Sequence, residues 1–327
     1  MATRSLTWRG WGLSVSVPAS VVARIRPRRA DQRHESTRGR ATATGALNFL
    51  DSPPVPRVQQ RDLQQAMSFV QIAHEKGDEH AAHAGFSGDD ALSQRIRAIS
   101  WYHTIELPDG TVTPGQFDHR ALLPRYGLPA RLDGQRALDV ATFDGFWAFE
   151  MEKRGAAVTA IDLDSTRDLD FPTRVRPLVD ASTNMAVVGD GFRLAHEALQ
   201  SRVERITTSV YNLSPETHGT FEFVHCGDLL LHLRDPLTAL ERIRSVTGRT
   251  FLLSDVVDID LAPGTFGPAV QYRGGWEDVV WWVPSLDSLA QMMIDAGFRT
   301  VSVNCVYQLA KTYEDWGFWR ASLTADV

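Results

Sequence analysis

The chain has 327 residues, of which 43% are hydrophobic, and it carries a formal net charge of −6. It has no run of roughly eighteen apolar residues that could span a membrane, and its two cysteines, Cys226 and Cys305, have no zinc-ligand spacing. Residues 1–50 carry +7, so residues 51–327 carry −13, which disfavours attraction of nucleic acid. We therefore expect a cytoplasmic protein with reduced cysteines, no metal site and no membrane segment.

Residues 1–56 show no sustained periodicity and end in the proline-rich stretch "DSPPVP". An arginine-rich, acid-poor beginning is compatible with a transit peptide, a nucleic-acid arm, or a translation start placed too early. Because such a sequence cannot bury a core, we expect these residues to be disordered and dispensable for folding.

Residues 57–134 are expected to form a helical and aromatic extension. The stretch "RDLQQAMSFVQIAHEKG" places Leu63, Met67 and Val70 on one helical face and ends at a glycine, and "DDALSQRIRAI" predicts a second short helix. Next comes an aromatic segment, residues 101–129, whose prolines and glycines indicate turns rather than regular elements. Its position before a nucleotide-binding strand indicates either a lid or an arm that packs on the sheet.

From residue 135 to residue 327, strands alternate with helices, which predicts a mostly parallel, doubly wound α/β sheet. Strands are expected at residues 136–141, 157–163, 203–210, 221–227, 250–257 and 300–309, with a final antiparallel strand at 317–323. Helices are expected at residues 146–155, 191–202, 235–246 and 285–298.

The turn after the first of these strands indicates a ligand site, because ligands of such sheets bind beyond the carboxyl ends of the strands. A dinucleotide turn normally carries three spaced glycines, whereas "DVATFDG" retains only Gly145. Ala141 is small enough to replace one glycine, but Phe143 disfavours the close approach of a pyrophosphate. The turn therefore favours a ligand that lacks a diphosphate.

Asp162 ends the next strand, 23 residues after Asp139. A carboxylate at this place can accept two hydrogen bonds from ribose hydroxyls, as in NAD enzymes. An acid at the end of the first strand, such as Asp139, also fits a class I methyltransferase. The spacing alone leaves both an NAD(P)-dependent oxidoreductase and a methyltransferase open.

Several collinear motifs extend this pattern, including "WYHTIELPDGTVTPGQFDHRALLPRYGLP", "SVYNLSP", "FEFVHCGDLLLHLRDPLTALERIRSV" and "VVWWVPSLDSLAQMMIDAGF". Together with the turn, they resemble the S-adenosylmethionine (SAM)-dependent methyltransferases related to tRNA 5-oxyacetyl-uridine (mo5U34) methyltransferase. The resemblance covers residues 101–298. It implies a Rossmann-like class I methyltransferase sheet of seven strands, with SAM as the cofactor.

The resemblance also implies contacts along the length of SAM. The methionine end would lie against the first turn, at Asp139, Ala141, Asp144 and Gly145. Ribose and adenine would lie against Asp162 and Leu163, and the adenine edge would be read at Ser209, Val210 and Tyr211. Ser209 stands where an aspartate is common, which weakens that contact. The opening for methyl transfer would be lined by Gly227 and Asp228.

Methyl transfer from a sulfonium is an in-line displacement, so the protein chiefly positions the two reactants. A hydroxyl acceptor must also lose a proton, and histidine is suited to accept it near neutral pH. His103 in "WYHT" is the first candidate, His119 in "FDHR" the second, and a solvated or structural role is the alternative for each. By the resemblance, His232 in "LLLHLRDP" has either a catalytic role or a structural one. Trp281 and Trp282 could wall an acceptor pocket or belong to the core.

We therefore predict a SAM-dependent methyltransferase that acts on a small molecule, at oxygen, in secondary metabolism. The alternative is a tRNA wobble-uridine methyltransferase, against which stand the acidic body and the lack of a basic stripe. An NAD(P)-dependent oxidoreductase and a catalytically silent SAM-fold partner subunit are the other classes considered. The sequence does not fix the acceptor or the oligomeric state.

The resemblance raises a further question, because the tRNA-modifying relatives use carboxy-SAM. A second carboxylate held away from water needs cationic partners. The candidates in the aromatic segment and the chain end are Arg120, Arg125, Lys311 and Arg320, and the end segment also carries Glu314 and Asp315. We expect ordinary SAM to be the donor.

Overall fold

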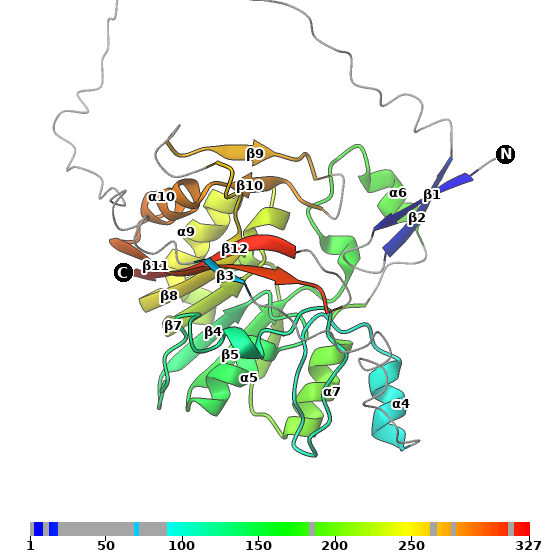
Figure 1. Cartoon of the computed structure of the whole chain (residues 1–327), viewed down its shortest axis with the longest axis horizontal. Helices are drawn as coiled ribbons and strands as arrows, with labels where there is room; N and C mark the ends of the chain where they lie inside the picture. Colours follow the sequence, from blue (N-terminus) through cyan, green and yellow to red (C-terminus); the bar gives the residue numbers. More distant parts are fainter. Residues whose placement is uncertain are drawn as a thin grey trace, which may run out of the picture.

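The computed structural model describes residues 3–8, 13–18, 69–71, 90–182, 187–261, 267–275, 279–312 and 317–327. Its centre is an eight-stranded sheet of order β3-β11-β12-β8-β7-β4-β5-β6 (Figure 1). The strands are β3 (Phe69–Gln71), β4 (Arg136–Val140), β5 (Ala157–Asp162), β6 (Glu204–Thr207), β7 (Phe221–Gly227), β8 (Thr247–Val256), β11 (Thr300–Ala310) and β12 (Gly317–Asp326).

The seven strands expected from the sequence are all present, and the sheet is mostly parallel as predicted. The last strand, β12, lies between β8 and β11 and runs antiparallel to both. From Arg320 to Asp326 the strand is therefore paired on both sides. It brings the end of the chain into the centre of the molecule.

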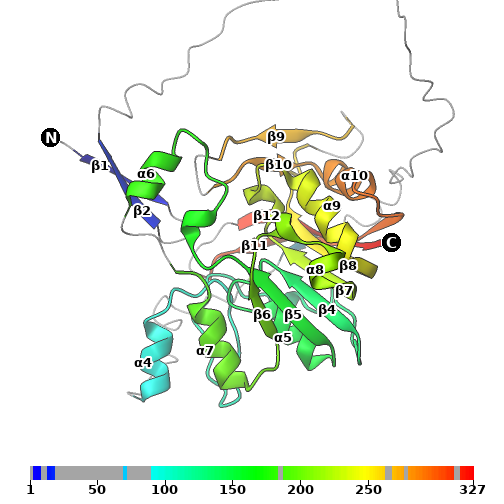
Figure 2. The same ribbon diagram turned by 180° about the vertical axis from the view of Figure 1, so that it is seen from behind.

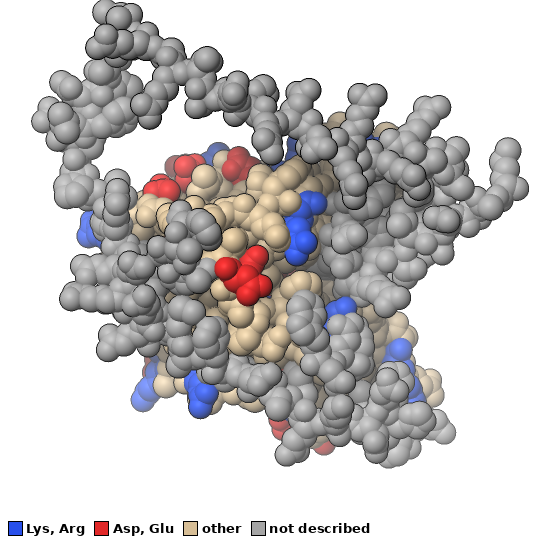
Figure 3. Space-filling model, turned by 45° about the horizontal axis from the view of Figure 1, so that its top comes forward, with Lys and Arg blue, Asp and Glu red and all other residues tan. Residues whose placement is uncertain are grey.

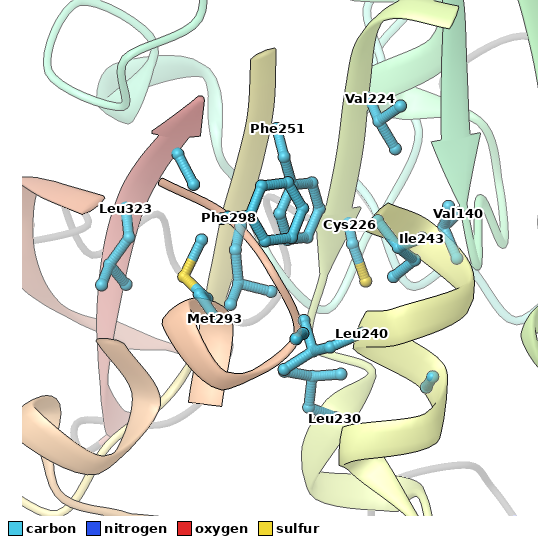
Figure 4. Packing of buried hydrophobic residues seen from close by; sticks show 14 of the residues in the cluster. Val140, Val224, Cys226, Leu230, Leu240, Ile243, Phe251, Met293, Phe298 and Leu323 are labelled. Atoms are coloured by element: carbon cyan, nitrogen blue, oxygen red, sulfur yellow. The ribbon is translucent and has the colours of Figure 1, made fainter. Parts of the chain in front are cut away.

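Helices cover both faces of the sheet, which leaves its strands buried on two sides (Figures 1 and 2). One face carries α9 (Pro236–Val246) and α10 (Leu286–Asp295), and the other carries α5 (Phe146–Lys153) and α7 (Asp190–Leu199). The helix α4 (Ala91–Arg97) packs against α7 at the edge of the molecule (Figure 1). Asp235 caps α9 and Ser285 caps α10, each accepting a backbone hydrogen bond three residues on. In the α9–α10 layer, Phe251 stacks on Phe298 at 5.2 Å between ring centroids (Figure 4).

The aromatic segment before β4 packs onto the sheet. Trp101, Ile105, Phe117, Leu122 and Tyr126 are all buried in the cluster formed by α5 and α7. The Trp101 indole donates to the carbonyl of Ile96 at the end of α4, which ties the segment to that helix. The segment is therefore a packed arm whose inner side also faces the ligand cavity described below.

In the N-terminal part, the structure describes a hairpin and a short strand that were not expected. Thr3–Trp8 (β1) and Leu13–Pro18 (β2) form an antiparallel hairpin. The alternation in "SLTW" and "LSVSVP" is the local signal for it. That residues 1–56 are dispensable for folding stays a prediction. Phe69–Gln71 pairs in parallel with β11, so the helix expected through these residues gives way to hydrogen bonding at the sheet edge. The rest of residues 1–89 lies outside the described part.

Some short elements were not predicted. They are α6 (Arg176–Ala181), α8 (Pro215–His218), and a small hairpin of β9 (Val270–Tyr272) with β10 (Trp282–Pro284). Trp281 and Trp282 anchor the hairpin, because their indole nitrogens donate to the carbonyls of Asp170 and Leu233. These two tryptophans are therefore packing residues rather than walls of the cavity.

Candidate active site

A cavity that is open to solvent lies beyond the carboxyl ends of the central strands, with about 1050 Å³ of empty space when its open part is included. Its lining comes from the aromatic segment, from the segments that follow β4, β5, β6 and β7, and from β8 and β11. This is the position expected for the ligand of a doubly wound sheet. The cavity-lining residues among those predicted for the cofactor are Ala141, Asp162, Leu163, Ser209, Val210, Tyr211, Gly227 and Asp228.

The turn after β4 keeps the conformation of a glycine turn with fewer glycines. Ala141, Phe143 and Gly145 have φ values of 60°, 47° and 91°. For Ala141 and Phe143 this conformation is unfavourable, by roughly 1–2 kcal/mol per residue. At Gly145 a Cβ atom would lie 2.6 Å from the Phe149 ring, so only glycine fits. The backbone thus holds the turn open toward the cavity.

Asp162 contributes to holding this turn. Its Oδ2 accepts a hydrogen bond from the Phe143 N–H at 2.6 Å, and its Oδ1 accepts one from the Leu163 N–H at 2.7 Å. Burial raises the pKa of Asp162 to about 6, although both backbone donors and Arg205 act in the opposite direction. Each carboxylate oxygen has two lone pairs, so both can also accept a ribose hydroxyl.

A pH dependence of SAM binding follows from this pKa. Ribose hydroxyls need the ionised carboxylate as acceptor, so we expect full affinity above pH 7. Affinity should fall below pH 6 as Asp162 takes up a proton, approaching about tenfold per pH unit. Calorimetric titrations from pH 5 to pH 8 measure this. Asp162→Asn, which cannot ionise, should bind SAM weakly at every pH. A wild-type affinity that does not change with pH would contradict the assignment of Asp162 to the ribose.

The segment after β6, which was predicted to contact adenine, forms part of the cavity wall. Ser209 caps the short 3₁₀ helix Val210–Asn212, and its hydroxyl accepts the Tyr211 N–H at 3.3 Å. The Tyr211 hydroxyl donates to Asp170 at 2.8 Å, which fixes its ring at the cavity wall. Ser209 therefore takes the capping role that an aspartate could also fill.

The ion pair between Asp228 and Arg320 lies at the cavity wall formed after β7. Both carboxylate oxygens of Asp228 accept from Nε of Arg320 at 2.9 Å, and Oδ2 also accepts from the Tyr102 hydroxyl at 2.9 Å. Burial on its own would raise the pKa of Asp228, but the charge and hydrogen bond of Arg320 outweigh it and lower the pKa. Asp228 thus keeps a negative charge at the cavity wall. Arg320 was expected only as a candidate partner for carboxy-SAM.

Three of the predicted cofactor residues are absent from this lining. Both carboxylate oxygens of Asp139 are engaged, by His225 and by the Thr142 hydroxyl, away from the cavity. Asp144 accepts the backbone N–H groups of Tyr102 and His103, and burial raises its pKa to about 7. Gly145 begins α5. The two acids thus support the turn and the aromatic segment, because their strand and loop positions direct them inward.

The three predicted catalytic histidines all line the cavity. The rings of His103 and His119 lie 5.5 Å apart. Burial, with a smaller effect of His119, lowers the pKa of His103 to about 3, so His103 is a weak base. The His232 ring contacts the Val279 carbonyl at 3.4 Å, which favours a structural role. A general-base role for any of them stays a prediction, and the low pKa of His103 counts against the first choice.

Sequence reasoning missed the inner end of the cavity. There the lining includes Tyr102, Tyr126, Trp147, Ser254 and Tyr307, which come from the aromatic segment, α5, β8 and β11. The only sequence signal was the density of aromatic residues before β4. Among the described residues, no group of three or more His, Cys, Asp or Glu side chains is arranged to hold a metal ion. Nor is any helix there long and apolar enough to cross a membrane.

Comparison with known proteins identifies the family. Residues 118–303, more than half of the chain, match a family described as "Methyltransferase domain". The chain belongs to this family and is a SAM-dependent methyltransferase. The family decides between NAD(P) and SAM, the two ligands that the turn and Asp162 left open, in favour of SAM. The matched range begins inside the segment that was expected to be an extension.

Individual relatives are more distant. The chain is 27% identical over 218 residues to ubiquinone biosynthesis O-methyltransferase of Xanthomonas campestris pv. campestris, which covers 64% of this chain and 77% of the relative. Among solved structures, the N-terminal domain of EvdMO1 with SAH and D-fucose is 15% identical, with a TM-score of 0.43, over 72% of this chain and 95% of that one. Magnesium protoporphyrin IX methyltransferase from Synechocystis PCC 6803 with bound SAM is 14% identical, with a TM-score of 0.41, over 77% and 93% of the two chains.

The residues of the cavity fit SAM. The carboxylates of Asp162 and Asp228 lie at its wall, and both suit a ligand that carries a sulfonium and an ammonium group. When bound, SAM supplies an activated methyl group to the acceptor. The protein has to hold the acceptor in line with that group and to exclude water.

Proposed function

We propose that this methyltransferase transfers the methyl group of ordinary SAM to a hydroxyl of a small, uncharged molecule. The observation that carries the proposal is the make-up of the cavity. Among the described residues that line it there is no Lys or Arg, whereas the inner end is rich in aromatic rings. Such a lining suits a neutral, largely apolar acceptor and offers no lysine or arginine partner to a phosphate or carboxylate.

Two further observations support a small-molecule acceptor. The curated relative is named an O-methyltransferase of ubiquinone biosynthesis, a small-molecule pathway. In addition, residues 51–327 carry −13. On the part of the face in Figure 3 that the structure describes, basic and acidic side chains form separate small groups without a continuous basic stripe. A tRNA would need such a stripe along its backbone.

The tRNA wobble-uridine alternative rests on the resemblance of the sequence motifs. Its donor, carboxy-SAM, needs a cation near the sulfonium. Arg120 pairs with Asp118 and Glu106, and Arg320 is paired with Asp228. Arg125 is exposed and does not line the cavity. These pairings disfavour carboxy-SAM and support ordinary SAM.

Incubation with labelled SAM tests the proposal. One reaction contains a panel of hydroxylated aromatic small molecules and the other contains bulk undermodified tRNA. We expect label in the small-molecule fraction only. Robust incorporation into tRNA would overturn the small-molecule assignment, and SAM binding without transfer to either would favour a silent partner subunit.

His103 is expected to affect turnover more than donor binding. Its backbone is held by Asp144 and its ring lies on the cavity wall beside His119, where the acceptor would lie. His103→Ala should therefore keep the SAM affinity while slowing turnover about 10²-fold, because the acceptor loses a side chain that orients it. Turnover within a fewfold of the wild type would remove His103 from the catalytic residues.

A further inference from the structure

A chain of buried hydrogen bonds leads from Asp139 to the inner end of the cavity. Asp139 and His225 are partners in the parallel ladder between β4 and β7, so their side chains lie on the same face of the sheet. Asp139 Oδ1 lies 2.7 Å from His225 Nδ1, and His225 Nε2 lies 2.9 Å from the Tyr126 hydroxyl. All three residues are only 1% exposed, and Tyr126 lines the cavity.

The donors and acceptors of this chain are fixed by chemistry. Asp139 also accepts the Thr142 hydroxyl at 2.7 Å. An ionised carboxylate can only accept, so Nδ1 of a neutral His225 donates to it and Nε2 becomes the acceptor. The Tyr126 O–H must then donate to Nε2. The Ser254 side chain also hydrogen-bonds the Tyr126 hydroxyl, so one lone pair of the Tyr126 oxygen is left to accept a hydrogen bond from another group.

Tyr126 is held rigidly in this position. Its ring stacks on Trp147 at 4.0 Å between centroids, and its backbone carbonyl accepts hydrogen bonds from Ser322 and Asn304. The nearby Ser254 and Tyr307 hydroxyls bond each other at 2.7 Å on the same wall. A planar aromatic molecule in the cavity can pack against these aromatic side chains, with a hydroxyl directed at the Tyr126 oxygen.

We propose that Tyr126, His225 and Asp139 form the proton relay that activates an aromatic hydroxyl acceptor; this rests on the proposed function above. As the acceptor oxygen loses its proton to the Tyr126 oxygen, the Tyr126 proton passes to His225 Nε2. The acceptor oxygen gains the methyl group as the bond between that group and sulfur breaks. The positive charge of the sulfonium ends on His225, where Asp139 stabilises it.

The alternative base, His103, lacks such support. Among the described residues, none accepts a hydrogen bond from its buried Nδ1 atom. A protonated His103 would therefore have no carboxylate partner of the kind that Asp139 gives to His225. Its effect on turnover would then come from orienting the acceptor.

The relay can be tested without turnover by binding 4-nitrophenol in the presence of SAH at pH 6. Free 4-nitrophenol is then mostly neutral, and its phenolate absorbs at longer wavelength. In the wild type the bound probe should show the phenolate spectrum, because its proton passes to His225. In Tyr126→Phe and His225→Gln, each confirmed as folded by thermal melting, the bound probe should stay neutral.

Thr247→Val is the matched control, because it removes a buried hydroxyl that lies outside the cavity and leaves the three-residue chain intact. It should keep the phenolate spectrum. If Tyr126→Phe does not fold, His225→Gln tests the same step. A neutral bound probe in the wild type, the same spectrum in wild type and relay variants, or no binding of the probe to the wild type would each overturn the relay.

Failure of the proposed relay can be distinguished from failure of the proposed function. With labelled SAM and the phenol panel, Tyr126→Phe should slow methyl transfer about 100-fold. A phenolate signal without methyl transfer to any hydroxyl compound would leave the relay standing and overturn the proposed function. Methyl transfer at the same rate in wild type and Tyr126→Phe would overturn the relay alone.

Discussion

Replacement of Arg320 by methionine is expected to lower the free energy of unfolding by about 3 kcal/mol. The guanidinium is buried against Asp228, and its Nη1 atom also donates to the carbonyls of Leu309 and Phe318. Removing one partner of a buried pair leaves an uncompensated charge, which typically costs about 3–5 kcal/mol. Asp228 has some access to the cavity, which favours the lower end. Denaturant unfolding measures the change.

The controls separate charge from packing. Arg320→Met combined with Asp228→Asn removes the lone charge and should recover part of the loss. The exposed pair Arg95–Glu197 lies outside the site, with side chains 51% and 66% exposed, so Arg95→Met should hardly change the transition. If Arg320→Met and Arg95→Met lowered the free energy of unfolding equally, the buried Arg320–Asp228 pair would be no more important for stability than an exposed one.

Replacement of Asp162 by alanine is expected to weaken SAM binding about 100-fold, and carboxy-SAM binding by the same factor. Two hydroxyls donating to a charged acceptor contribute about 1.5–3 kcal/mol each, part of which water recovers. The Phe143 N–H would also lose its acceptor, which loosens the turn. Because both donors share the ribose, the loss should not discriminate between them.

Asp164→Ala is the matched control for this change. Asp164 lies two residues further along, pairs with Arg205, and is absent from the cavity lining. Its removal should leave SAM affinity within a fewfold of the wild type. Calorimetric titration gives both values, and an Asp162→Ala variant that binds SAM normally would exclude Asp162 as the ribose partner.

The sheet was predictable because its signals are local. Each central strand is a short apolar run bounded by turn residues, and β7 has the bounds that the sequence indicated. The place of Asp162 beside the turn was predictable because it ends a strand of the sheet. The hairpin β1–β2 carried an alternating pattern that the high arginine content obscured.

Other features depend on contacts that no local pattern encodes. The pairing of β3 with β11 joins residues far apart in the chain. Asp139 was assigned to the cofactor from its position, but the register between β4 and β7 places His225 against it. The Tyr126–His225 bond spans 99 residues, and the Arg320–Asp228 pair spans 92. Such partners follow from the order and register of strands, which the sequence alone left undetermined.

A side-by-side calorimetric titration of SAM and carboxy-SAM tests the central claim most directly. The cavity lining offers carboxylates and no Lys or Arg among its described residues, so a cationic donor without an added carboxylate should be preferred. We expect SAM to bind in a one-to-one complex at least as tightly as carboxy-SAM. A clear preference for carboxy-SAM would show that a cation such as Arg120 or Arg125 reaches the donor, and it would restore the tRNA assignment.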